Sequence, residues 1–155
     1  MQASPVEIMR KALNVARKTS PEDFSIGAVI SNPQGVVISS ATNRVYGERD
    51  LTGHAEVLAL RALPSSHDQV FFRSLTLAVT LEPCPMCAWA IRMVGIGKVI
   101  FGAYNDQYGA AGSVFDLLRD GRVLRPVEVI GGVLEGECRD LLSADFDKIR
   151  HNWGR

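Results

Sequence analysis

Hydrophobic residues near the N-terminus recur at the spacing of an α-helix. The recurring positions are Ile8, Met9, Ala12, Leu13, Val15 and Ala16. They follow Ser4-Pro5-Val6-Glu7, which has the capping serine, first-turn proline and glutamate that are typical of a helix start. We therefore predict a first helix over residues 5–18.

Two β-prone runs come next, over residues 24–31 and 36–42. The four residues between them, Asn32-Pro33-Gln34-Gly35, place a proline and a glycine where a tight turn needs them. This pattern predicts a β-hairpin.

The rest of the chain alternates between helical and strand-like runs. We predict helices over 54–63, 84–94 and 134–150, a short helical piece over 114–118, strands over 75–80, 98–102 and 127–130, and a polar connection over 65–74. Alternation of this kind favours the α/β class. The expected architecture is a three-layer α/β/α sandwich with a mixed five-stranded sheet.

Length and composition restrict the picture further. With 155 residues, 46% of them hydrophobic, the chain is expected to form a single domain over residues 1–155. Lys and Arg together number 17, as do Asp and Glu, so the formal net charge is +0 and no overall positive field attracts nucleic acid. The N-terminal segment has no continuous apolar region, and no apolar run approaches 18 residues. These features predict a cytoplasmic protein without a membrane partner.

Two short stretches carry the candidate chemistry: His54-Ala55-Glu56 and Pro83-Cys84-Pro85-Met86-Cys87. A Cys-x-x-Cys pair at a helix start and an upstream histidine supply two thiolates and one imidazole, three of the four ligands of tetrahedral zinc. The fourth position is then free for water, which zinc acidifies. The motif predicts a catalytic zinc site.

Glu56 has a separate role in this interpretation. Residues i and i+2 of a helix do not share a face, so Glu56 is not expected to bind the same metal ion as His54. It is expected beside the metal, where a carboxylate can transfer protons as a general acid and base.

Simpler interpretations of these residues remain open. Cys138 could complete a closed structural zinc site, although it lies on the apolar stripe of the last predicted helix, where a cysteine commonly acts as a small hydrophobic residue. Cys84 and Cys87 alone could be a redox pair, and Glu56 alone could stabilise a helix N-terminus. The His-x-Glu motif upstream of the cysteines favours a metal site over a redox pair for Cys84 and Cys87, and a catalytic role over a helix-stabilising one for Glu56.

Across almost its whole length the chain resembles the cytidine-deaminase superfamily, and within it the bacterial tRNA adenosine deaminases. The zinc nucleobase deaminases share the His-x-Glu and Pro-Cys-x-x-Cys signature. The further segments that carry the resemblance are Asn43-Arg44, Thr52-Gly53, Leu81-Glu82, Ile96–Ala103, Gly109–Ser113, Gly132-Val133-Leu134 and Glu137-Cys138.

This resemblance implies a role for each candidate residue. His54, Cys84 and Cys87 would bind one Zn²⁺ per chain, and Glu56 would be the catalytic proton shuttle. Asn43 would hydrogen-bond the substrate nucleoside, and Phe146 would contact the tRNA anticodon loop, although its helical spacing alone favours a core position. The resemblance also implies a homodimer, with the helix after Cys87 contributing to the contact.

The expected function is therefore hydrolytic conversion of adenosine to inosine at the tRNA wobble position. Tyr104-Asn105-Asp106 and Leu124-Arg125-Pro126 depart from the tRNA enzymes' usual residues, and Pro85-Met86 also occurs in guanine deaminases. A deaminase of a free base or small nucleoside, of the guanine or cytosine type, therefore stays open. An alternative from another class, a non-catalytic, zinc-stabilised RNA-binding protein, also stays open.

Overall fold

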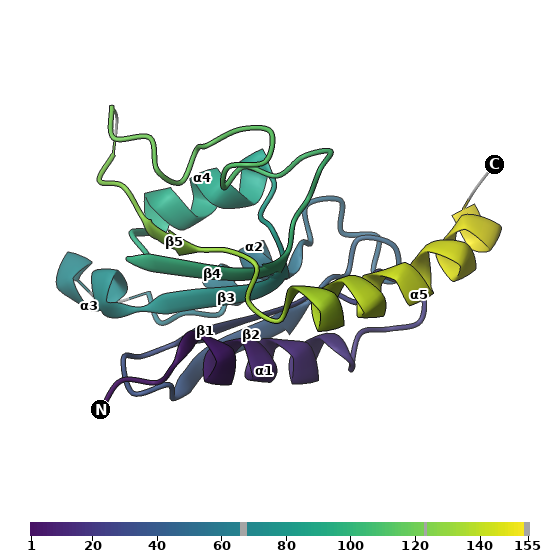
Figure 1. Ribbon diagram of the computed structural model, residues 1–155, viewed down its shortest axis with the longest axis horizontal. Helices are drawn as coiled ribbons and strands as arrows, with labels where there is room; N and C mark the ends of the chain where they lie inside the picture. Colours follow the sequence, from purple (N-terminus) through teal and green to yellow (C-terminus); the bar gives the residue numbers. More distant parts are fainter. Residues whose placement is uncertain (66–67, 123, 154–155) are drawn as a thin grey trace.

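Five strands form one mixed sheet in the order β2-β1-β3-β4-β5 in the computed structural model (Figure 1). The structure describes residues 1–65, 68–122 and 124–153, with side chains described as far as residue 146. Strand β1 pairs antiparallel with β2 and β3, whereas β3, β4 and β5 run parallel to one another. The strands are β1 (Gly27–Ser31), β2 (Val37–Thr42), β3 (Thr76–Leu81), β4 (Lys98–Ala103) and β5 (Glu128–Ile130).

Helices cover both faces of this sheet, which confirms the predicted three-layer α/β architecture (Figure 1). Helices α1 and α5 pack on one face, and α2 and α4 pack on the other. The helices are α1 (Pro5–Ala16), α2 (Ala55–Arg61), α3 (Gln69–Ser74), α4 (Pro85–Val94) and α5 (Glu135–Trp153).

Alternate residues of the central strands enter two separate cores, because successive side chains of a strand point to opposite faces. One core joins alternate strand residues to α1 and α5: Val29, Ala78 and Ile100 meet Met9, Leu13 and Leu142. The other joins the intervening strand residues to α2 and α4: Ile30, Leu77 and Val99 meet Ala59 and Ile91. The sheet therefore separates the two hydrophobic layers.

The predicted N-terminal elements are confirmed. Ser4 caps α1 through a capping box with Glu7, and Pro5 occupies the first turn. The helix ends at Ala16, two residues before the predicted boundary. The hairpin also forms, with β1 and β2 joined through the predicted turn at residues 32–35.

Two predictions about the connections are wrong. Residues 65–74 contain α3, whose start is capped by the Asp68 side chain accepting a hydrogen bond from the Phe71 N–H. Residues 114–118 form turns and an isolated bridge instead of a helix. Within the described part of the chain, no helix combines the length and apolarity that membrane crossing requires.

Candidate active site

Two helix N-termini bring the candidate metal ligands together. His54 is the N-cap residue of α2, and Cys84 is the N-cap residue of α4. Cys87 follows in the first turn of α4, so the i, i+3 spacing puts its sulfur on the same side as that of Cys84. Because α4 begins just after β3 ends, the site lies at the carboxyl end of a central strand.

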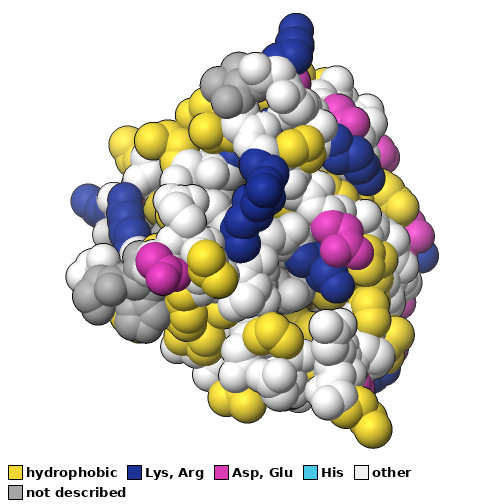
Figure 2. Space-filling model, turned by 90° about the vertical axis from the view of Figure 1, so that its left-hand side faces the viewer, with side chains coloured by type: hydrophobic (Ala, Val, Ile, Leu, Met, Phe, Trp, Pro, Cys, Tyr) yellow, Lys and Arg dark blue, Asp and Glu magenta, His cyan; other side chains and the backbone are white. Residues whose placement is uncertain are grey.

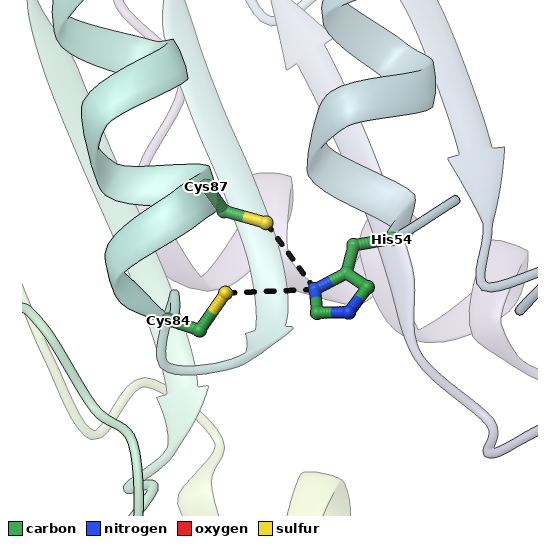
Figure 3. Close-up of side chains that lie close together, drawn as sticks. All are labelled: His54, Cys84 and Cys87. Atoms are coloured by element: carbon green, nitrogen blue, oxygen red, sulfur yellow. Dashed lines mark hydrogen bonds between the residues drawn. The ribbon is translucent and has the colours of Figure 1, made fainter. Parts of the chain in front are cut away.

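The three ligand atoms converge on one point (Figure 3). The His54 Nδ1 atom lies 3.6 Å from the Cys84 sulfur and 3.4 Å from the Cys87 sulfur. In a tetrahedral zinc site with ordinary bond lengths, the nitrogen-to-sulfur distance is about 3.5 Å. The spacing of these donor atoms therefore fits zinc.

The contact between the two cysteines shifts their pKa values in opposite directions. A hydrogen bond from the Cys87 thiol stabilises the Cys84 thiolate and lowers the pKa of Cys84 to about 4. The pKa of Cys87 is raised, since its thiol donates a hydrogen bond to Cys84 and is also buried. A divalent ion would provide the charge that lets both sulfurs ionise.

Glu56 lies beside these ligands, as the second residue of α2. Its side chain is buried, with 4% of the residue exposed. Burial raises the pKa of Glu56 to about 7, and the hydrogen bond from its own backbone N–H opposes that shift only in part. Such a carboxyl group can both accept and donate a proton near neutral pH.

A cavity of about 200 Å³ opens from this cluster. His54, Glu56 and Cys84 contribute to its wall, and Asn43 faces it from the segment that follows β2. Asn43 is 5% exposed, and its Oδ1 atom has no hydrogen-bond partner among the described residues. A buried polar atom without a partner is uncommon and suits a ligand contact.

Phe146 lies outside this cavity, at an adjoining groove of about 580 Å³. The residue is 53% exposed, so the core position favoured by its spacing is wrong. The cavity and the groove share six lining residues: Phe24, Ile26, Tyr46, Leu81, Asn105 and Tyr108. The two spaces therefore lie next to each other.

Cys138 is kept away from the metal ligands by the sheet. It is fully buried in the core between α5 and the strands, on the face opposite α2 and α4. Its sulfur packs so closely on Gly102 that a Cβ atom there would lie 2.2 Å from it. The closed structural site with Cys138 as fourth ligand is therefore wrong.

Among the described residues, no lysine or arginine lines the cavity itself. Arg44 pairs with Glu48 at 3.7 Å, while the side chains of Lys148 and Arg150 lie outside the described residues. At the opposite end of the molecule, beyond α3, Figure 2 shows Lys and Arg interspersed with Asp and Glu. This face therefore carries both positive and negative side chains, in keeping with the formal net charge of +0 for the whole sequence.

Several pocket residues escaped the sequence analysis. Phe24, Tyr46, Asn105 and Tyr108 line the cavity from loops, although the sequence pattern places Phe24 at the start of a strand. Glu82 was noted only as part of a motif, yet it lines the cavity and is buried. Its position just before the Pro-Cys-x-x-Cys segment is the sequence feature that could have predicted Glu82 as a residue of the site.

Residues 3–103 match the cytidine and deoxycytidylate deaminase zinc-binding region. The chain belongs to this deaminase family. The family is zinc-binding, and the His54, Cys84 and Cys87 cluster can hold that ion. The resemblance stated from the sequence is thereby confirmed.

Three relatives define the similarity within the family. A tRNA-specific adenosine deaminase of Bacillus subtilis is 37% identical over 143 residues, which cover 92% of this chain and 88% of that protein. A solved structure from a study of A-to-I editing by tRNA:A34 deaminases at the wobble position has a TM-score of 0.74 and 31% identity, covering 87% of this chain and 98% of that one.

The third relative is a longer protein. A tRNA(Ile)-lysidine synthase of Deinococcus radiodurans is 38% identical over 143 residues, or 92% of this chain. The matched region spans 24% of that protein. The similarity there is therefore to one part of a larger chain.

Proposed function

We propose that the protein is a zinc-dependent hydrolytic deaminase that converts adenosine to inosine at the wobble position of tRNA, as a single domain over residues 1–155 and in the cytoplasm. The observation that carries the proposal is the convergence of His54, Cys84 and Cys87 next to buried Glu56 in one pocket. A purely structural metal site has no use for a buried carboxyl group facing the same cavity.

Each residue has a defined task in this reaction. A zinc ion held by the three ligand atoms would supply a Lewis acid that makes water nucleophilic at neutral pH. Glu56 would take one proton from the attacking water and pass it to the ring nitrogen. It would then carry the second proton, from the hydroxyl formed at the attacked carbon, to the amino group that leaves as ammonia. Asn43 hydrogen-bonds the nucleoside through its free Oδ1 atom, so that the amino-bearing carbon faces the metal.

An RNA substrate is supported by two observations. The similarity to tRNA-specific adenosine deaminases extends over most of both chains. The cavity also adjoins a groove lined by aromatic side chains, including Tyr104, Tyr108 and Phe146. Unpaired bases of an RNA loop are recognised by stacking on such rings.

Ammonia release tests the proposal. The purified zinc-loaded protein is offered, in parallel, an anticodon stem-loop, adenosine, cytidine, cytosine, guanine and adenine. We expect release from the stem-loop alone. Release from a free base only would support the small-substrate deaminase, which the neutral charge of the chain favours, and release from none would support the non-catalytic RNA-binding protein.

A homodimer is supported by the outer face of α4. Met86, Trp89 and Met93 follow one another at helical spacing and are 37%, 37% and 69% exposed. An apolar stripe of this kind is typical of a protein contact surface. Met93→Glu should give a monomer in sedimentation experiments, whereas Leu51→Glu, at an 83% exposed position in another segment, should not. A dimeric Met93→Glu variant would contradict this contact.

A further inference from the structure

Glu82 is a buried carboxylate that the reaction does not use. It precedes Pro83 and Cys84, and only 1% of the residue is exposed. None of its described partners is a cation: its hydrogen bonds to described residues come from the segment that follows β4. A buried charge held in this way is unusual enough to require an explanation.

Four donors from this segment meet the two carboxylate oxygens of Glu82. The backbone N–H of Asn105 donates to Oε1 at 3.2 Å, and the hydroxyl of Ser113 donates to the same atom. The backbone N–H groups of Ala111 and Ser113 donate to Oε2 at 3.0 and 3.1 Å. Hydrogen bonds to an ionised acceptor are roughly twice as strong as neutral ones.

Residues 105–113, which Glu82 holds, form part of the wall of the cavity beside Glu56. Asn105 and Tyr108 both line the cavity that holds Glu56 and the metal ligands. The Asn105 side chain in turn accepts hydrogen bonds from the N–H groups of Gln107 and Tyr108, at 3.2 and 3.0 Å. The position of Tyr108 thus depends on Glu82 through Asn105.

The same contacts tie this wall to the metal ligands. The Ala110 N–H donates to the carbonyl of Pro83 at 2.7 Å, directly before Cys84. The backbone approaches so closely that a Cβ atom on Gly109 would lie 2.5 Å from the Glu82 carboxyl group. Two segments far apart in sequence are therefore fixed to each other at the mouth of the site.

We propose that Glu82 is a positioning residue, which fixes residues 105–113 as the wall against which the substrate base is held. The proposal rests on the proposed function for the identity of that base. Glu82 acts through Asn105 and Tyr108 and does not take part in proton transfer. Loss of its carboxylate should therefore weaken substrate binding more than it slows the chemical step.

The first test is independent of activity. Amide hydrogen exchange is measured by NMR on the zinc-loaded wild type and on Glu82→Gln, which replaces one acceptor oxygen by a donating amide. We expect exchange at Asn105, Ala111 and Ser113 to become about tenfold faster, with no change at Val79 in the sheet. Unchanged exchange at the three amides would overturn the proposal, whatever the substrate is.

The second test uses the substrate that the wild type deaminates. For Glu82→Gln we expect KM to rise about tenfold, kcat to change less than about threefold, and one zinc per chain to remain. Val99→Ala, a core truncation on β4 at a residue that lines neither the cavity nor the groove, should lower stability and leave KM unchanged. A fall in kcat at constant KM, or the same KM change in both variants, would contradict positioning.

Ser113→Ala keeps the test decisive if Glu82→Gln does not fold. It removes one of the four donors and leaves the carboxylate in place. We expect faster exchange at the Asn105 amide and a KM increase of about twofold to threefold. An unchanged KM together with unchanged exchange would overturn the proposal.

Discussion

The ring of Phe146 on α5 meets the ring of Phe24 edge-on, with centroids 5.1 Å apart and the planes at 60°. Phe24 lines the cavity next to Glu56, so this contact links the C-terminal helix to the wall of the active site. Phe146 keeps about half of its surface exposed while it is held in place by Phe24. An aromatic ring that is fixed and exposed beside a pocket is suited to stacking with an unpaired base.

Phe146→Ala is expected to weaken binding of an anticodon stem-loop. Base stacking on an aromatic side chain contributes about 1–3 kcal/mol, so KM for the stem-loop should rise about tenfold or more. The free energy of unfolding should fall by about 1 kcal/mol or less, since half of the residue is already exposed. Steady-state kinetics and thermal unfolding measure the two effects. An unaltered KM would remove Phe146 from the RNA-binding surface.

Glu56→Gln is expected to abolish most of the activity while the fold and metal content persist. The amide has nearly the shape of the carboxyl group but cannot move protons, so turnover should fall about 10²-fold or more. Zinc stoichiometry by elemental analysis and circular dichroism provide the controls. Wild-type turnover in this variant would show that Glu56 has no part in the reaction.

The variant Asn43→Ala tests whether Asn43 contacts the substrate or stabilises the fold. Because Oδ1 of Asn43 makes no hydrogen bond among the described residues, its removal should cost the fold little. The loss of one hydrogen bond to substrate should lower kcat/KM about tenfold or more. The melting temperature and kcat/KM are measured together. A large loss of stability with normal kcat/KM would mean that Asn43 serves the fold.

Cys138→Ala should leave the metal in place. Its sulfur lies across the sheet from His54, so the variant is expected to bind one zinc per chain. Truncation of a fully buried side chain should lower the free energy of unfolding by about 1 kcal/mol. Cys84→Ala and Cys87→Ala are the matched comparisons and should lose zinc. Zinc loss from the Cys138 variant would place this residue at the metal.

The regular parts of the fold could be predicted because their signals are local. The capping box at Ser4 and Glu7 marks the start of α1, and the turn at residues 32–35 marks the hairpin. The relation of His54 to Cys84 could also be predicted, since metal ligands restrict both the residue types and their places at helix starts. The capping box and the turn depend on residues close together in the sequence, and the relation of His54 to Cys84 depends on the requirements of one metal ion.

The two wrong predictions about the connections, at residues 65–74 and 114–118, have physical causes. Helix α3 has six residues, too few for a helical period to be recognised, although Asp68 was a usable capping signal. Residues 114–118 have the apolar residues of a helix, but the chain before them is held by Glu82, about 30 residues earlier. The N–H groups of Val114 and Phe115 donate to the Gly109 carbonyl instead. A long-range acceptor thus decides this local conformation.

Inosine formation in an anticodon stem-loop tests the central claim most directly. The zinc-loaded protein is incubated with the stem-loop, and inosine is measured by mass spectrometry at about 50 and about 200 mM salt. We predict inosine at the wobble position and a fall in kcat/KM of about tenfold at the higher salt, as expected for about two phosphate contacts. Deamination of free guanine or cytosine at a rate independent of salt, with an unmodified stem-loop, would contradict the account.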